Sequence, residues 1–218
     1  MGLRLGCAGP KALVELGGTP LLLRTLERFR PLGLLENAVI ITPPDHIDAF
    51  AEVLAGALPK VEFRLVAGGA ERQDSVGNGL DALDEDTEVV AIHDAARPFV
   101  AVESVAASIE AAQEHGASTV AIPCIDTILR SDADDFLCET PDRRELWACQ
   151  TPQTFQTAVI REAHAAARAD DFVGTDDASL VQRLGRPVKL VMGTALNLKV
   201  TTPEDLALAE MILERGLA

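Results

Sequence analysis

Long apolar runs, paired cysteines and positive charge are all scarce in this sequence, and each absence excludes a class of protein. No apolar run approaches the roughly 20 residues that a membrane-spanning helix needs, and the N-terminus shows no signal-peptide pattern. The four cysteines are scattered, without a Cys-x-x-Cys pair or a neighbouring histidine. This spacing argues against structural zinc and a disulfide framework, so we expect a protein of the reducing cytoplasm, without a membrane partner.

Positive charge is rare enough to restrict the partners. The formal net charge is -15, and lysine occurs only four times. A general nucleic-acid binder needs a basic face for the phosphates, so we expect no nucleic-acid partner. A small phosphorylated substrate is compatible with this charge if the few cations gather at one site.

Short apolar segments alternate with longer helical patterns along the chain. A chain of 218 residues with 48% hydrophobic content can bury a full core, and we expect a single domain over 1–218. The alternation predicts an α/β fold of three layers around a mostly parallel sheet. We expect Thr19 to cap the first helix and Thr175 to cap a helix that starts at Asp176. The expected strands are 38–42, 63–66, 89–92, 118–122, 147–151 and 188–192, and the expected helices are 20–29, 45–58, 72–83, 102–115, 157–168, 176–184 and 203–214.

This alternation stops between residues 126 and 146. Two extended-looking stretches, 127–130 and 135–139, are joined by the polar turn Ser131-Asp132-Ala133-Asp134. The pattern predicts a hairpin that belongs to no strand–helix unit. We expect 127–146 to protrude as a β-arm, either a lid or an arm that packs on another subunit.

The segment His93-Asp94-Ala95-Ala96-Arg97-Pro98 follows the apolar run 89–92, which is typical of a buried parallel strand. Open α/β sheets bind ligands at the carboxyl ends of such strands. Asp94 could hold Mg²⁺, and Arg97 could hold a phosphate in two-point geometry. On this segment alone, Asp94 could equally cap a turn while Arg97 pairs with a surface acid.

Cations also occur near the start of the chain. Residues 1–11 contain three glycines together with Arg4 and Lys11, as expected of a loop that approaches a ligand closely; the alternative is a frayed terminus. No combination of residues suggests covalent catalysis. We expect His93 to make a packing hydrogen bond, and Arg72, at a helix start, to be solvated.

Taken together, these motifs resemble the 2-C-methyl-D-erythritol 4-phosphate cytidylyltransferase family. Their order and spacing span essentially the whole chain, which makes the set far more specific than any member. The matching pieces are Gly2-x-Arg4-Leu5 to Pro10-Lys11-Ala12, Gly68-Gly69-x-x-Arg72-x-x-Ser75-Val76, His93 to Pro98, Asp142-Arg143 to Leu146-Trp147, Gln150-Thr151-Pro152-Gln153, Thr175-Asp176-Asp177-Ala178-Ser179 and Asn197-x-Lys199-Val200-Thr201-x-Pro203-Glu204-Asp205.

The resemblance implies a Rossmann-like nucleotidyltransferase fold, a homodimer, and the use of CTP with a divalent cation, usually Mg²⁺. The implied reaction transfers a cytidylyl group to a sugar-alcohol phosphate and releases pyrophosphate, in the non-mevalonate isoprenoid pathway. Two alternatives remain open. The acceptor could be another polyol phosphate, such as ribitol 5-phosphate, or the chain could be a non-catalytic dimeric nucleotide-binding homologue.

The resemblance also implies a role for each matching residue. The catalytic cations would be Arg4, Lys11, Arg143 and Lys199, and the nucleotide would be bound by Gly2, Gly68, Gly69, Ser75 and Asp94. The acceptor would be bound by Asp94, Arg97, Thr127, Arg143, Thr175 and Lys199, with Asp94 also holding the metal and Thr127 and Arg143 crossing to the partner subunit.

The sequence departs from the family pattern at its start. The family begins with a buried strand that runs into an Ala-Ala-Gly segment, whereas here Met1 directly precedes Gly2. We therefore expect the first strand of the family fold to be missing before residue 1, and the chain as written to be less stable and weakly active or inactive.

Overall fold

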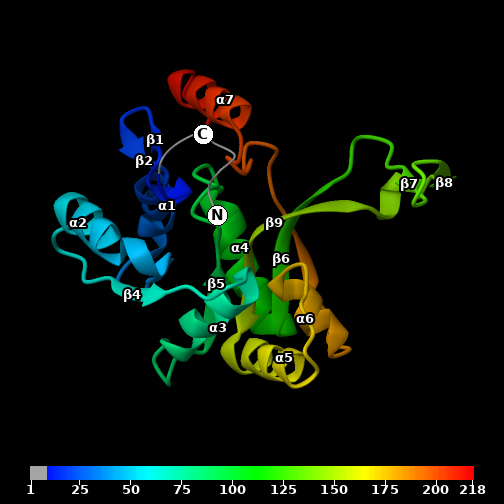
Figure 1. Ribbon diagram of the computed structural model, residues 1–218, viewed down its shortest axis with the longest axis horizontal. Coiled ribbons are helices and arrows are strands. Elements are labelled where there is room, and N and C mark those ends of the chain that lie inside the picture. The colour runs from blue at the N-terminus through cyan, green and yellow to red at the C-terminus, as the bar shows by residue number, and fades with distance from the viewer. Residues whose placement is uncertain (1–8) are drawn as a thin grey trace.

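The computed structural model of the chain describes residues 9–218. Gly2, Arg4 and the expectation about a first strand lie outside the described residues. The described part is a mixed α/β structure in which helices cover a twisted sheet and a thin arm projects from one side (Figure 1). The α/β prediction is therefore confirmed.

The larger sheet has four strands in the order β10-β6-β9-β5. β10 is parallel to β6, and β9 is antiparallel to both β6 and β5, so three of the four strands point the same way. A separate pair, β3 and β4, is parallel. The strands are β1 (Glu15–Leu16), β2 (Thr19–Pro20), β3 (Val39–Thr42), β4 (Arg64–Ala67), β5 (Val89–Ile92), β6 (Ala117–Pro123), β7 (Arg130–Ser131), β8 (Leu137–Glu139), β9 (Trp147–Gln156) and β10 (Lys189–Met192).

β5 differs from the buried parallel strand that the sequence predicts. All four of its residues are only half-buried, and its ladder partner β9 is antiparallel. The reason is its position: within residues 9–218, β5 is hydrogen-bonded to a strand on one side only. Its carboxyl end nevertheless leads directly into His93 and Asp94, as expected.

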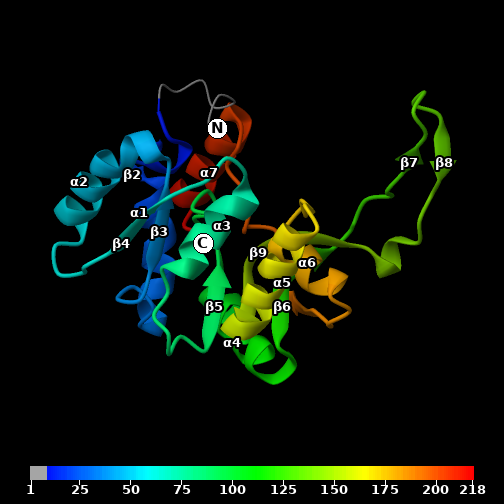
Figure 2. The same ribbon diagram turned by 60° about the horizontal axis from the view of Figure 1, so that its bottom comes forward.

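Alternating residues of β9 show how the helices cover the two faces of the larger sheet. Phe155 packs into a cluster with residues of α3, α5 and α6. The preceding residue, Thr154, bonds the hydroxyl of Ser108 on α4 at 2.9 Å. Because successive strand residues point to opposite faces, α4 covers one face and α5 and α6 the other, which gives three layers (Figure 2). The α-helices are α1 (Leu21–Phe29), α2 (Ile47–Ala57), α3 (Arg72–Asp81), α4 (Val102–His115), α5 (Thr157–Ala169), α6 (Asp177–Arg183) and α7 (Pro203–Glu214).

Two predicted helix caps are wrong. Thr19 lies in β2, which pairs with β1 in a small hairpin, so Pro20 takes the N-cap position of α1 without a side-chain hydrogen bond. Thr175 is one residue too early, because Asp176 accepts the backbone N–H of Ser179 at 2.8 Å and caps α6. A carboxylate is a strong acceptor at the positive end of a helix.

The predicted β-arm is present as a hairpin that projects from the body (Figures 1 and 2). β7 and β8 pair antiparallel at its tip, and both strands are shorter than the sequence suggests. The arm exposes large apolar side chains, including Leu129 (61% exposed) and Phe136 (71%). Within the described chain, no helix is long and apolar enough to cross a membrane.

Candidate active site

Asp94 is the centre of a cluster of charged side chains at the carboxyl end of β5. One carboxylate oxygen, Oδ2, lies 2.6 Å from Nζ of Lys199 and 3.9 Å from Nε of Arg97. The other, Oδ1, lies 3.8 Å from Nε of Arg72. Three cations therefore surround one carboxylate, although the net charge of the chain is strongly negative. A site for an anionic ligand requires such a local excess of positive charge.

These cations fix the ionisation of the carboxylate. Burial alone would raise the pKa of Asp94, but the charges of Lys199, Arg72 and Arg97 outweigh it and hold the pKa below its usual value. Asp94 is therefore ionised at neutral pH, and its carboxylate can accept a metal ion or hydrogen-bond donors.

His93 holds the turn after β5 through both of its ring nitrogens. The backbone N–H of Asp94 donates to Oγ1 of Thr151 at 3.1 Å, and Oγ1 lies 3.0 Å from Nδ1 of His93. The Thr151 hydroxyl can then donate to Nδ1, which leaves Nε2–H to donate to the carbonyl of Arg97 at 3.2 Å. One ring nitrogen bonds Thr151 on β9 and the other bonds the turn itself, so His93 has the packing role that the sequence suggests.

This role predicts a pH effect on stability. Burial is the main cause that lowers the pKa of His93 from 6.5 to about 4. The unfolded chain therefore takes up a proton near pH 6.5 while the folded chain does not, and stability falls as pH drops from there towards 4, by about 3 kcal/mol in total. Gln at position 93 offers one acceptor and one donor, as the neutral imidazole does, but it does not titrate. Urea unfolding of His93→Gln between pH 7 and 4 should show a flatter loss than wild type, and parallel curves would contradict this.

A buried amide joins the turn to the loop that carries Lys199. Nη1 of Arg97 donates to the backbone oxygen of Asn197 at 2.7 Å. The side chain of Asn197 is buried and donates to Oε1 of Gln150 at 3.0 Å and to the backbone oxygen of Thr151 at 2.9 Å. Sequence reasoning assigned no role to Asn197, although its place two residues before Lys199 in a matched motif was a signal.

Gly68 and Gly69, in the loop between β4 and α3, pack against Ser75 in the first turn of α3. The N–H of Gly69 donates to Oγ of Ser75 at 3.0 Å, and Oγ donates to the backbone oxygen of Glu71 at 2.9 Å. A Cβ on Gly69 would lie 2.3 Å from that of Asp74, so only glycine fits. This loop leads into Arg72, the first residue of α3, whose Nε lies 3.8 Å from Oδ1 of Asp94.

The expectation that Arg72 is solvated holds in part, because its side chain is 39% exposed while its guanidinium is ion-paired. Nη1 of Arg72 donates to the buried carboxylate of Asp177 at 2.7 Å, while Nε faces Asp94. Burial alone would lower the pKa of Arg72, but the charges of Asp177 and Asp94 outweigh it and raise the pKa. The approach of α3 and α6, which are distant in sequence, creates this contact, and single-sequence patterns do not reveal it.

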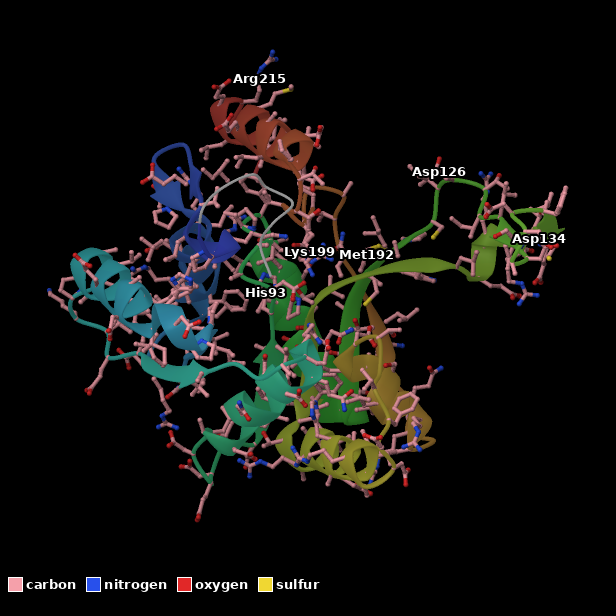
Figure 3. All side chains as sticks on the ribbon, in the orientation of Figure 1. His93, Asp126, Asp134, Met192, Lys199 and Arg215 are labelled. Atoms are coloured by element: carbon pink, nitrogen blue, oxygen red, sulfur yellow. The ribbon has the colours of Figure 1, made fainter. Side chains whose placement is uncertain are left out.

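Other predicted site residues lie elsewhere in the chain. Thr127 and Arg143 are exposed on the arm, where Nη1 of Arg143 donates to the backbone oxygen of Ile125 at 2.9 Å. Figure 3 shows Asp134 on the arm, and Asp126 just before it, away from His93 and Lys199. Among the described residues, the ion-pair partners of Asp94 are Arg72, Arg97 and Lys199, and neither Thr127 nor Arg143 is among its contacts.

Two further predicted residues lie in the body of the protein. Thr175 is exposed and immediately precedes the cap of α6. Lys11 begins a short 3₁₀ helix, Lys11–Leu13. The next residue, Ala12, packs on the same apolar cluster as Ala95, so the start of the described chain shares a core with the turn after β5.

The donor set suits a metal ion that arrives with a phosphate ligand. Within residues 9–218, no group of three or more His, Cys, Asp or Glu side chains is arranged to hold a metal. Mg²⁺ is often bound by one or two carboxylates together with substrate phosphates. Asp94 can supply one such oxygen, so the residues fit this mode of binding.

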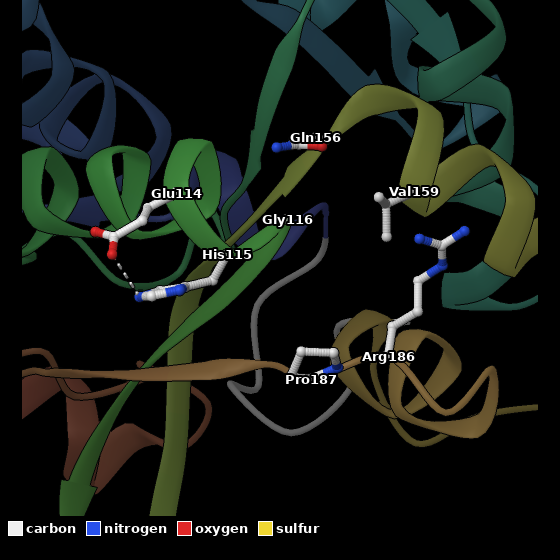
Figure 4. Close-up of a pocket in the computed structure, with 7 residues that line it drawn as sticks. All are labelled: Glu114, His115, Gly116, Gln156, Val159, Arg186 and Pro187. Carbon is white, nitrogen blue, oxygen red and sulfur yellow. Dashed lines mark ion pairs between the residues drawn. The ribbon is translucent and has the colours of Figure 1, made fainter.

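A separate hollow lies near the amino end of β6, and Asp94 is not among the residues that line it (Figure 4). Its polar groups already have partners: a ring nitrogen of His115 lies 3.7 Å from Glu114, and Arg186 pairs with Glu162 at 2.6 Å. The Asp94 cluster, with cations from three elements, is the stronger candidate for anion chemistry.

The chain is similar to known proteins of one family along nearly its whole length. The family model described as 2-C-methyl-D-erythritol 4-phosphate cytidylyltransferase matches residues 1–215. A relative of that name from Caldanaerobacter subterraneus subsp. tengcongensis is 43% identical over 94% of this chain and 91% of its own length. One from Symbiobacterium thermophilum is 45% identical over 98% and 89%.

Solved structures agree with these relatives. The 4-diphosphocytidyl-2C-methyl-D-erythritol synthase of Anaerococcus prevotii superposes with a TM-score of 0.87 at 31% identity, covering 95% of both chains. The 2-C-methyl-D-erythritol 4-phosphate cytidylyltransferase of Thermus thermophilus gives 0.79 at 39% identity, also over 95% of both. The predicted nucleotidyltransferase fold is confirmed, and the chain belongs to the 2-C-methyl-D-erythritol 4-phosphate cytidylyltransferase family.

Proposed function

We propose that this protein transfers the cytidylyl group of CTP to 2-C-methyl-D-erythritol 4-phosphate in the non-mevalonate route to isoprenoids. A phosphate oxygen of the acceptor bonds to the α-phosphorus of CTP, the bond from that phosphorus to the bridging oxygen of the β-phosphate breaks, and pyrophosphate leaves. The observation that carries the proposal is the Asp94–Lys199–Arg97–Arg72 cluster in a chain of this family.

The cluster suits this chemistry because the nucleophile needs no strong base. A phosphate monoester has its second pKa at about 6 and is largely a dianion at neutral pH. The reaction then depends on in-line positioning and on cations around the phosphate oxygens. Lys199 and Arg97 hold the acceptor phosphate, and the loop with Gly69 and Ser75 holds the nucleotide.

A divalent cation completes this scheme. Asp94 is the residue that would hold it, through the carboxylate oxygen that Lys199 does not occupy. When bound, such an ion neutralises negative charge on the nucleotide phosphates. Lys11 and Arg4, from the start of the chain, add positive charge for the triphosphate.

We further propose that the protein is a homodimer joined through the arm, residues 127–146. Exposed apolar residues gather there, among them Ile128, Leu129, Phe136 and Leu137, and a protein surface seldom leaves such a group uncovered. The arm also carries Thr127 and Arg143. In a dimer of this kind, each arm would bring these two residues to the acceptor site of the other subunit.

A complementation experiment tests the exchange of arms. Arg143→Ala and Lys199→Met are each expected to be nearly inactive. In a two-fold dimer, an equimolar mixture refolded together should recover about a quarter of wild-type activity, because half the dimers are mixed and each has one intact site. Lys60 lies away from the cluster, so a refolded mixture of wild type and Lys60→Met serves as the control for refolding. No recovery in mixtures that sedimentation shows to be dimeric would contradict the exchange.

The reaction itself is tested by pyrophosphate release from CTP and Mg²⁺. Turnover with 2-C-methyl-D-erythritol 4-phosphate in preference to ribitol 5-phosphate is expected. The opposite preference would identify a cytidylyltransferase for another polyol phosphate. Calorimetric binding of CTP without turnover of either acceptor would instead favour a non-catalytic nucleotide-binding homologue.

A further inference from the structure

The guanidinium of Arg72 is shared unequally between two carboxylates. Nη1 makes a short charge-assisted hydrogen bond of 2.7 Å to Oδ2 of Asp177. Nε lies 3.8 Å from Oδ1 of Asp94, which is beyond hydrogen-bond distance. Arg72 is therefore anchored to Asp177 and stands beside Asp94 without closing on it.

Both carboxylate oxygens of Asp177 and its backbone N–H have partners. Its side chain is 1% exposed, and its Oδ1 lies 3.2 Å from Nε2 of His164 on α5. Its backbone N–H donates to Oε1 of the buried Gln153 on β9 at 3.0 Å. A buried carboxylate cannot turn away from such partners without a large desolvation cost, so Asp177 provides a rigid anchor for Arg72.

The two oxygens of Asp94 differ in what remains open to a ligand. Oδ2 is bonded to Lys199 at 2.6 Å. Among the described contacts, Oδ1 has only Arg72 as a charged neighbour, at 3.8 Å. A movement of about 1 Å would bring Arg72 to hydrogen-bond distance and would occupy this second oxygen as well.

From this geometry we infer that Asp177, braced by His164, restrains Arg72 and so keeps Oδ1 of Asp94 open for the divalent cation that accompanies the nucleotide. Arg72 and Asp177 are then positioning residues. The inference rests on the proposed function, which places the cation at Asp94. Two other roles give different results: Arg72 could contact the nucleotide directly, or Asp177 could serve only to pack α6 against α5.

Direct metal binding separates these roles. Mn²⁺ is titrated in the presence of α,β-methylene-CTP, and the free ion is followed by electron paramagnetic resonance. Asp177→Asn should weaken Mn²⁺ binding by about tenfold, as expected when a charge-assisted hydrogen bond no longer holds Arg72. Adding Arg72→Gln to that variant should return the Mn²⁺ affinity to within about threefold of wild type, because the released Arg72 side chain, which competes with Mn²⁺ for Asp94, is then absent.

Three single variants complete the test. Asp170→Asn removes an arginine–carboxylate pair, with Arg183 at 2.6 Å, on the surface and should leave Mn²⁺ affinity unchanged. Asp94→Asn should abolish binding at this site. Arg72→Gln alone should bind Mn²⁺ at least as tightly as wild type, and this test holds even if the buried substitution at Asp177 prevents folding.

Either of two results would contradict the inference that Asp177 restrains Arg72. Weaker Mn²⁺ binding in Arg72→Gln alone would show that Arg72 supports the bound nucleotide and metal directly. An Asp177→Asn defect that persists in the double variant would show a purely structural role for Asp177. Pyrophosphate release, measured on the same samples, reports separately on the proposed function. Binding of Mn²⁺ to the protein in the presence of the analogue does not involve the acceptor.

Discussion

Replacing Lys199 with methionine is expected to lower kcat about 10²- to 10³-fold, as the loss of one preorganised charge at a reacting group does in other enzymes. Nζ of Lys199 lies 2.6 Å from Asp94, and its side chain is 43% exposed, so it can reach a ligand that enters from solvent. Methionine keeps much of the length and apolar character of the side chain but removes the charge. KM for the acceptor phosphate should rise, while KM for CTP should change less.

The matched control is Lys189→Met. Lys189 is exposed at the start of β10, so the same substitution there removes one positive charge from the protein without touching the Asp94 cluster. Steady-state kinetics of both variants, with each substrate varied in turn, separate a local role from a general effect of net charge. Equal small losses in the two variants would remove Lys199 from the mechanism.

Removal of the Lys199 charge should also alter Asp94. Burial raises the pKa of this carboxyl, and Lys199 is the strongest of the charges that outweigh burial and lower the pKa. In Lys199→Met the pKa of Asp94 should therefore rise. A carboxyl group whose pKa is lower in the folded than in the unfolded state stabilises the fold at pH values above the unfolded pKa, and this stabilisation is lost as pH falls through the folded pKa. The variant has less of this stabilisation to lose, so its stability should fall less than that of wild type on acidification.

Local patterns predicted much of the fold and part of this site. The helix 102–115 and the strand 89–92 were predicted at their observed bounds, because each has a clear periodicity and turn residues at its ends. The cluster of Asp94, Arg97 and Lys199 followed from the rule that ligands bind at strand carboxyl ends and from the family resemblance. The arm was predicted because the alternation of short strands and helices stops there.

The contacts that were missed are long-range ones. Arg72 and Asp177 are 105 residues apart in the sequence, and Asn197 is 46 residues from the Thr151 carbonyl to which it donates. No periodicity links such pairs, because tertiary packing rather than local propensity brings them together. The predicted cap of α6 was wrong for a different reason. Thr175 and Asp176 are both good N-cap residues, and the sequence alone does not show which of two adjacent candidates caps the helix.

Replacing Phe155 with alanine is expected to cause the largest loss of stability, about 3–5 kcal/mol. The ring is 0% exposed and packs among Leu80, Ile160 and Leu180, where α3, α5 and α6 meet the sheet. Because these three residues come from three separate helices, they cannot all move in to fill the cavity. For a chain of this size the melting temperature should fall by roughly 10 °C.

Phe172→Ala is the control for this loss, because Phe172 is 38% exposed and contacts mainly the Arg183 guanidinium, 4.6 Å from the ring centre. We expect a loss of no more than about 1 kcal/mol there. Denaturant unfolding of both variants at one protein concentration gives the comparison, and equal losses would show that the cluster is not a tight core. Phe155 lies on β9 four residues beyond Thr151, which contacts the Asp94 turn. The folded fraction of Phe155→Ala should therefore retain near-normal kcat, since this ring supports the sheet and touches none of the charged groups at its carboxyl edge.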